Sequence, residues 1–228
     1  MKKTGISLSF LFSALMLSLS QNVSALPNVV YENDFNSGID SAWSDSSLHA
    51  ADRGVTSQYH GNYTLGGGTT LTLTGLDAHD QIFLEFDLYL FHTWDGEDTS
   101  YGKDFFSLSG EVTFSETFTN HQSEGQSYPG SPDAIPYGSG ASATHVYLGL
   151  DPTGSGDGFL ADHTSDTFSV TFGGPTTQSD EWWGIDNVKV SINSIQQPPS
   201  GKVPTPPTLV LMLMGLMGFA VKRKQAKA

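Results

Sequence analysis

The sequence feature that most constrains the fold is an alternation of apolar and polar residues with a period of two. It is clearest in IFLEFDLYLFH, residues 82–92, where apolar residues occupy every second position. Side chains two positions apart point to the same face of a β-strand. The same spacing recurs at residues 71–73, 112–118, 146–150, 168–172 and 188–192. No segment between an apolar leader and residue 208 shows a helical period, so the body of the chain is predicted to be all-β.

Each predicted strand has one apolar face, and two antiparallel sheets packed together bury such faces best. Threonine and aromatic residues are frequent in these runs, and clusters of Gly, Asp and Ser separate them, which favours strands over helices. We therefore expect an antiparallel β-sandwich, a jelly roll of eight or more strands, over residues 26–193. An immunoglobulin-type sandwich fits less well in size and in its Cys and Trp pattern. Val146, Leu148 and Leu150 are expected to share one strand face.

The two ends of the chain differ from this body. Lys2 and Lys3 precede an apolar run from 6 to 19, and the small residues before and at Ala25 suit a signal peptidase. Residues 1–25 are thus predicted to be a secretory signal peptide helix cleaved after Ala25, rather than a buried helix of the domain. Residues 194–207 form a Pro-, Ser- and Gln-rich linker, and residues 208–228 a short hydrophobic helix with a basic tail.

The charge of the body excludes some classes of partner. All 24 acidic residues lie between residues 26 and 201, where the basic residues are Arg53, Lys103 and Lys189, so the body carries a net charge of −21. Such a field repels nucleic acid and attracts divalent cations and basic partners, so no nucleic acid is expected to bind. The chain has no cysteine, so the exported domain is held by its hydrophobic core or by metal rather than by disulfides.

Glu85, Asp87 and Tyr89 form the pattern closest to a catalytic one. On a strand these side chains share one face, as paired carboxylates do in glycoside hydrolysis. Jelly-roll glucanases have a third acid where this chain has Tyr89, so an acid/base partner is missing. There is also no Gly-x-Ser-x-Gly elbow for a nucleophile. A solvated strand face is therefore favoured, and the protein is predicted not to be an enzyme.

A structural Ca²⁺ site is possible at Glu32, Asp34 and Asp186. Asp186 shares parity with Val188 and Val190, so its carboxylate is expected to point into the sandwich, where it needs hydrogen-bond donors or a cation. Oxygen ligands of this kind suit Ca²⁺. The alternative is that backbone N–H groups or a tryptophan indole satisfy Asp186.

The acidic loop of residues 92–104 holds further candidates. Asp95, Glu97 and Asp98 form a second possible metal set, with a solvated acidic turn as the alternative. Residues 119–143, rich in Gly, Ser and Pro, are a second long surface loop. Trp94, Asp95 and Trp182 are candidate glycan contacts, because exposed aromatic rings with polar neighbours suit sugars, whereas Trp183 is assigned to the core.

The body resembles exported bacterial jelly-roll domains of the laminin-G/concanavalin-like class. The segments that carry the resemblance are YENDFNSG with Trp43, the run from residue 70 to 90 with the following WDG, and WWGIDNVKV. The resemblance covers about residues 29–192. It implies a binding module, often for glycans and often with calcium, and names no ligand.

The tail resembles the PEP-CTERM sorting signal of Gram-negative bacteria. Val203, Pro204 and Pro206 match its Val-Pro-Glu-Pro core, while Thr205 replaces the usual Glu. The resemblance implies processing by exosortase, commonly in species that make exopolysaccharide. The apolar run from 209 to 221 spans about 20 Å as a helix, against about 30 Å for a bilayer core. A cluster of Lys222, Arg223 and Lys224 follows and would stay on the cytoplasmic side.

Together these features predict an exported, non-enzymatic protein of the cell envelope, outer surface or extracellular matrix, anchored in the inner membrane at least transiently. Its expected partners are an exosortase-type enzyme and an exopolysaccharide or other glycan. A structural matrix or surface-coat protein without a specific ligand is the alternative, and a polysaccharide hydrolase using Glu85 and Asp87 is less favoured.

Overall fold

A computed structural model gives the fold of residues 27–64, 66–121, 124–133, 137–138, 143–174 and 181–194. This part of the chain is all-β, as predicted. Its strands are β1 (Asn28–Asn33), β2 (Leu48–His49), β3 (Tyr59–Tyr63), β4 (Thr69–Thr74), β5 (His79–Phe91), β6 (Phe105–Gly110), β7 (Phe114–Thr117), β8 (Thr144–Tyr147), β9 (Phe159–Asp162), β10 (Thr167–Gly173) and β11 (Trp182–Ser194).

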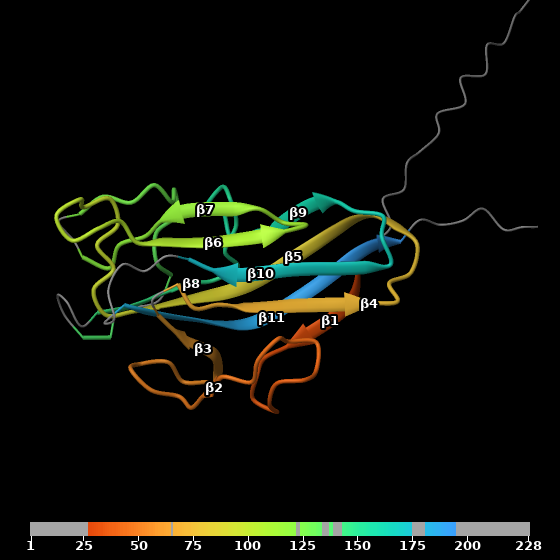
Figure 1. The fold of residues 1–228 in the computed structure, drawn as a ribbon, viewed down its shortest axis with the longest axis horizontal. Coiled ribbons are helices and arrows are strands. Elements are labelled where there is room, and N and C mark those ends of the chain that lie inside the picture. Colours follow the sequence, from red (N-terminus) through yellow and green to blue (C-terminus); the bar gives the residue numbers. More distant parts are fainter. Residues whose placement is uncertain are drawn as a thin grey trace, which may run out of the picture. The chain divides into compact units, whose positions relative to one another are not determined.

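The strands form two antiparallel sheets, so the predicted β-sandwich is confirmed (Figure 1). The larger sheet has seven strands in the order β2-β3-β11-β5-β8, with β1 also paired to β11 and β9 also paired to β5. The smaller sheet has four strands in the order β4-β10-β6-β7. The two longest strands, β5 and β11, pair along most of their length and form the backbone of the larger sheet.

The core lies between the sheets and follows the alternation seen in the sequence. The even-numbered apolar residues of β5 are at most 1% exposed, and those of β10 are fully buried. Phe86 of β5 meets Phe172 of β10 edge-to-face, with ring centroids 5.1 Å apart. Burying each such side chain contributes about 1.5–3 kcal/mol, so the alternation itself drives the sheets together.

A β-bulge in β11 changes which residues face the core. Asp186 pairs with Asp87 and Lys189 pairs with Glu85, so two residues of β11 lie opposite Phe86 alone. The extra residue is Asn187, whose φ of 50° is left-handed. Ile185 and Val188 therefore both face the core, while Asp186 faces the other side of the sheet. The prediction that Asp186 points into the sandwich is wrong because the bulge inverts the parity.

The alternation also fails after β8. Leu150 is buried in the core, but Leu148 is 50% exposed and Val146 packs on the other side of the sheet. The strand ends at Tyr147, and Gly149 then takes a left-handed φ of 54° in a turn. The expected common face of Val146, Leu148 and Leu150 is therefore wrong, because the three residues do not belong to one strand.

Among the described residues, an apolar cluster covers one end of the outer face of the seven-stranded sheet. There Val55, Tyr59, Tyr89 and Phe91 form a second, smaller apolar cluster. A Cβ atom at Gly184 would lie 2.6 Å from the Tyr59 ring, so glycine is required for this ring to pack on β11. The other end of the same face stays open to solvent, and it holds the groove described below.

Several predicted features lie outside the described residues. They are the signal peptide with Ala25, most of the 194–207 linker, the motif at 203–206 and the tail from 208 to 228. Among the residues that are described, there is no helix with the length and apolar character needed to cross a bilayer.

Candidate functional site

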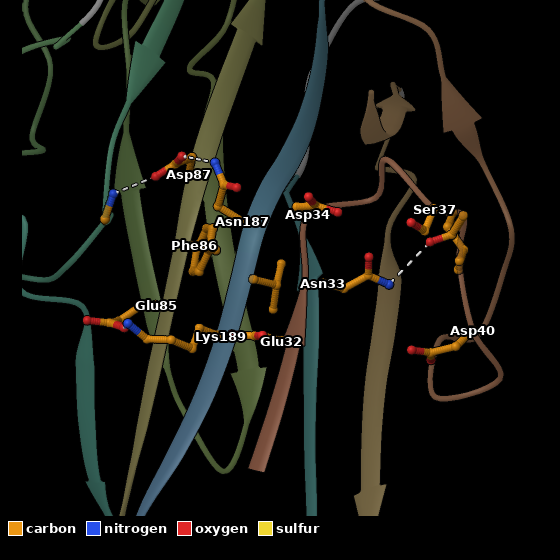
Figure 2. Close-up of a pocket in the computed structure, with 14 residues that line it drawn as sticks. Glu32, Asn33, Asp34, Ser37, Asp40, Glu85, Phe86, Asp87, Asn187 and Lys189 are labelled. Carbon is orange, nitrogen blue, oxygen red and sulfur yellow. Dashed lines mark hydrogen bonds and ion pairs between the residues drawn. The ribbon is translucent and has the colours of Figure 1, made fainter. Parts of the chain in front are cut away.

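A groove of about 880 Å³ lies on the open end of the outer sheet face. β1 and the loop after it form one bank, and β5 with Gly149 forms the other, with β11 between them (Figure 2). The groove is strongly polar. Its charged lining residues are five carboxylates and one ammonium group, from Glu32, Asp34, Asp40, Glu85, Asp87 and Lys189.

The strand register sets one row of charges across the groove. Lys189 of β11 lies directly opposite Glu85 of β5 on one side and Glu32 of β1 on the other. Its ammonium group is ion-paired with Oε2 of Glu85. These two side chains are 42% and 37% exposed. A pair so open to water adds little to stability and keeps its hydrogen-bonding capacity for a ligand.

Asp87 is 9% exposed, and its carboxylate links the turn at Gly149 to the bulge at Asn187. Its Oδ1 accepts a 2.9 Å hydrogen bond from the Gly149 N–H, and its Oδ2 accepts a 2.7 Å bond from Nδ2 of Asn187. The bulge places the Asn187 side chain toward Asp87, and the hydrogen bond between them fixes the Asn187 amide. Both oxygens of Asp87 are therefore used by the protein itself.

Local hydrogen bonds fix the side of the groove formed by β1 and the loop after it. Oδ1 of Asn33 accepts a 2.7 Å bond from the N–H of Phe35, whose buried ring anchors the loop in the core. Nδ2 of Asn33 donates to the carbonyl of Gly38 at 3.3 Å. Hydrogen bonds from Asn36 hold the pKa of the exposed Asp34 below its usual value. The chain's own hydrogen bonds thus hold this side of the groove in place.

An apolar row lies beside the charged row on the same open face. Phe83 of β5 is opposite Leu160 of β9 and Ser191 of β11, and Ser191 is opposite Val29 of β1. Leu160 is 57% exposed and Val29 is 47% exposed. Phe83 precedes Glu85 by two residues, so it shares the groove's face. Sequence reasoning missed this row, although a phenylalanine out of phase with the core positions of β5 was a visible signal.

Asp186 is buried on the outer face of the sheet, where protein groups rather than a metal ion contact its carboxylate. It is 1% exposed, and its Oδ2 accepts hydrogen bonds from the hydroxyls of Ser57 at 2.6 Å and Tyr89 at 2.9 Å. Its Oδ1 accepts a 2.8 Å bond from the Asn187 N–H. Burial raises the pKa of Asp186, and these donors oppose that shift. Of the donors expected in the alternative to a metal, a backbone N–H is present, whereas hydroxyl groups of Ser57 and Tyr89 take the place of a tryptophan indole.

The structure does not bring Glu32, Asp34 and Asp186 together. Glu32 and Asp34 line the groove, whereas Asp186 is not among its lining residues. Within the described ranges, the one group of acidic or histidine ligands close enough for a shared cation consists of Asp95, Asp104 and Glu181.

This acidic triad lies at the loop end of the sandwich. The possible ligand atoms of Asp95, Asp104 and Glu181 are all within 4.8 Å of one another. Asp104 and Glu181 are 0% and 1% exposed, and Asp95 is half-buried. The Asp95 N–H donates a 2.6 Å bond to Oδ2 of Asp104. Burial, followed by the neighbouring carboxylates of Glu124 and Asp104, raises the pKa of Asp95 to about 6.

The triad could hold a hard divalent cation. Oxygen ligands suit Ca²⁺ or Mg²⁺, and buried carboxylates of like charge are costly unless a cation or proton joins them. The Lys and Arg side chains of the body have other surroundings, whereas His121 is near enough to Asp95 to oppose the rise in its pKa. Arg53 stacks over Trp182, Lys103 pairs with Glu97, and Lys189 lies in the groove.

One residue of the acidic set predicted in this loop lies in the triad. Asp95 belongs to the triad, but Glu97 pairs with Lys103, which holds the pKa of Glu97 below its usual value. Asp104 and Glu181 were missed, since they are separate in sequence. Their shared signal is a carboxylate placed immediately before a strand, β6 for Asp104 and β11 for Glu181.

The tryptophans differ in their surroundings. Trp94 is fully buried, and its Nε1 donates a 3.1 Å bond to the carbonyl of Trp182, so the expectation that it is exposed is wrong. Oδ1 of Asn120 accepts a bond from the Trp94 N–H and holds this loop against the core. The Trp182 ring is half-buried, with the Arg53 guanidinium 4.4 Å from its centroid. Trp183 lies in the core as expected.

Comparisons with known proteins assign no family. No family model matches the chain, and no curated protein matches it. Similar solved structures include the K3 and K1 cleaved adhesin domains of Lys-gingipain from Porphyromonas gingivalis W83, at 13% and 16% identity and a TM-score of 0.37 each. They cover 71% and 72% of this chain and 98% of their own. The CBM22-1 xylan-binding domain of Paenibacillus barcinonensis Xyn10C is 10% identical with a TM-score of 0.35, covering 74% of this chain and 97% of its own.

Proposed function

We propose that this chain is an exported, non-enzymatic binding module that holds a neutral glycan on the open half of the seven-stranded sheet. The observation that carries the proposal is the placement of an apolar row beside a row of hydrogen-bonding charges. The apolar row contains Phe83, Leu160 and Val29, and the charged row contains Glu85 and Lys189. Both rows belong to one uncovered sheet face.

A sugar ring has the matching chemistry. Its C–H face packs on flat apolar surface, and its hydroxyl groups both donate and accept hydrogen bonds. In this arrangement Phe83 and Leu160 support the ring face, while Glu85 accepts from hydroxyls and Lys189 donates to them. The bank beyond β1 adds further acceptors at Asp34 and Asp40.

The charge of the groove favours neutral over acidic glycans. With five carboxylates against one ammonium group, a uronate, sulfate or phosphate on the ligand meets repulsion at most positions. Discrimination therefore comes from like-charge repulsion as much as from attraction.

A hydrolase is disfavoured by the roles of the two groove carboxylates on β5. Glycoside hydrolysis needs one carboxyl group to give a proton and another to attack or to activate water. Asp87 spends both oxygens on Gly149 and Asn187, and Glu85 is ion-paired with Lys189. The third position of the pattern, Tyr89, is buried and bonded to Asp186.

In the same proposal, the acidic triad holds a structural Ca²⁺ ion. Its ligands come from the loop after β5, the start of β6 and the start of β11. A cation there would tie three chain segments together and remove the repulsion among the carboxylates. Export, handling by an exosortase-type enzyme and a transient membrane anchor are supported by the sequence motifs at residues 1–25 and 203–224.

Titration of the full-length chain with neutral and acidic polysaccharides tests the binding function. Binding to at least one neutral polymer, with none to uronate-rich polymers, is expected. If no polysaccharide of either class binds, the protein is not a glycan-binding module. Calcium-dependent self-association without sugar binding would instead favour the structural matrix protein.

A further inference from the structure

His79 and His163 form a buried pair that belongs neither to the groove lining nor to the acidic triad. His79 is the first residue of β5 and is 1% exposed, and His163 follows β9 and is 7% exposed. Nε2 of His79 lies 2.7 Å from Nδ1 of His163, and the two ring planes are within 18° of each other with centroids 5.0 Å apart. A contact this short between two ring nitrogens requires a proton between them, because two lone pairs would repel.

The outer nitrogens of the pair both face backbone carbonyls. Nδ1 of His79 is 2.6 Å from the carbonyl oxygen of Asp77, and Nε2 of His163 is 3.1 Å from that of Thr167. A carbonyl oxygen only accepts, so both of these ring nitrogens must donate. Together with the shared contact, the arrangement needs three N–H protons on two rings. Two neutral imidazoles supply only two.

We propose that His79 and His163 hold one extra proton between them, as an imidazole–imidazolium pair. The proton completes a chain of three hydrogen bonds from Asp77 through both rings to Thr167. This chain fastens the end of β9 and the turn into β10 to the start of β5. A bridging metal ion does not fit, since two nitrogens bound to one tetrahedral zinc ion lie about 3.3 Å apart, farther than the 2.7 Å between these two.

The surroundings favour a positive charge on the pair. Four exposed carboxylates, those of Asp77, Asp80, Asp162 and Asp166, lie on the segments that carry the rings. No basic side chain other than the pair occurs in residues 76–81 or 159–173. The Phe168 ring of β10 stands edge-to-face with His163, at 5.7 Å. The end of β11 paired with this part of β5, residues 192–194, and the end of β4, Thr74, contribute no titratable side chain.

One bound proton gives a distinctive pH dependence. An unfolded histidine has a pKa of about 6.5, so the unfolded pair binds two protons well below that pH and none well above it. The native pair binds one throughout. The contribution of the pair to the free energy of unfolding therefore rises with pH below about 6.5, is greatest near pH 6.5, and falls at higher pH. Each limb approaches a tenfold change in the unfolding constant per pH unit, the limit for one proton.

Denaturant unfolding of the full-length chain in EDTA between pH 5 and pH 8.5 tests this, with His79→Gln and His163→Gln as variants. The difference between parent and variant should be bell-shaped and centred near pH 6.5. Parent and variant curves that stay parallel would overturn the shared proton.

Nitrogen NMR of the parent protein decides the matter if the variants fail to fold. The expected spectrum at pH 7.5 has protonated nitrogens at Nδ1 of His79 and Nε2 of His163, and intermediate shifts at the two facing nitrogens. Two neutral rings, each with one bare nitrogen at this pH, would refute the proposal.

Discussion

The hydroxyl of Tyr89 donates a 2.9 Å hydrogen bond to Oδ2 of Asp186, across the β5–β11 pair. Tyr89 stands where a catalytic acid would complete the Glu85–Asp87 pattern. Here it serves instead to satisfy a buried carboxylate beneath the Ser57 segment. The bond therefore marks the border between the covered and open halves of the sheet face.

Asp186→Ala should lower the free energy of unfolding by about 1–3 kcal/mol, because it leaves the buried donors of Tyr89 and Ser57 unsatisfied. Denaturant unfolding with and without Ca²⁺ measures this. The loss should be the same in both conditions. A loss that appears only with Ca²⁺ would return Asp186 to a metal site.

Calcium should raise the melting temperature of the parent protein, and EDTA should reverse the rise. Ligand at a hundredfold excess over Kd stabilises by about 2.7 kcal/mol. Asp104→Asn should abolish the response, whereas Asp34→Asn, which changes a groove carboxylate, should keep it. A parent protein indifferent to Ca²⁺ would rule out a stabilising site.

Calcium affinity should fall as pH drops through about 6, since protons compete with the metal for Asp95. The sign follows from the raised pKa. Without metal, the native state is favoured while Asp95 is protonated, and this stability is lost as pH rises through about 6. Calorimetric titration at pH 5 and pH 7 checks the affinity. Asp95→Asn should bind more weakly and lose most of the pH dependence; an unchanged dependence would exclude Asp95 as the proton site.

Phe83→Ala and Glu85→Gln should each weaken neutral-glycan binding about tenfold, equivalent to about 1.4 kcal/mol. The first removes the apolar support and the second a charged acceptor. Asp77→Asn, which removes an exposed carboxylate outside the groove lining, serves as the charge-matched control. Equal affinities for all four proteins would place the ligand elsewhere.

Replacing Pro204 and Pro206 together by alanine should block C-terminal processing in the native host. Proline keeps the preceding residues extended, as a protease cleft requires. Intact mass of the mature protein reads the outcome. A variant of the same processed mass as the parent would show that these prolines are not read.

The parts of the fold set by local alternation were predictable. Each inward residue of β5 from Ile82 to Leu90 was placed correctly, because an uninterrupted strand has fixed parity. The bulge at Asn187 was not predictable, since an extra residue is defined only against the paired strand. Asp186 was for that reason placed on the wrong face.

The sites were less predictable than the strands. Trp94 lies in a polar sequence, yet Asn120 from another loop holds its segment against the core. The acidic triad joins residues 95, 104 and 181, and only the meeting of strand ends brings them together. Proximity of this kind is a property of topology, which a single sequence does not display.

Because of the bulge at Asn187, the core-facing residues of β11 have odd numbers on one side of it and even numbers on the other. Before it, the odd-numbered Trp183 and Ile185 face the core; after it, the even-numbered Val188 and Val190 do. Deleting Asn187 would leave Val188 opposite Phe86 and Lys189 opposite Glu85, so the inward residues would stay inward. Drawing Asn187 into regular pairing without the bulge would instead turn Lys189 and Ser191 inward and expose their apolar neighbours. One extra residue, kept out of the pairing, therefore determines which face every later residue of β11 presents.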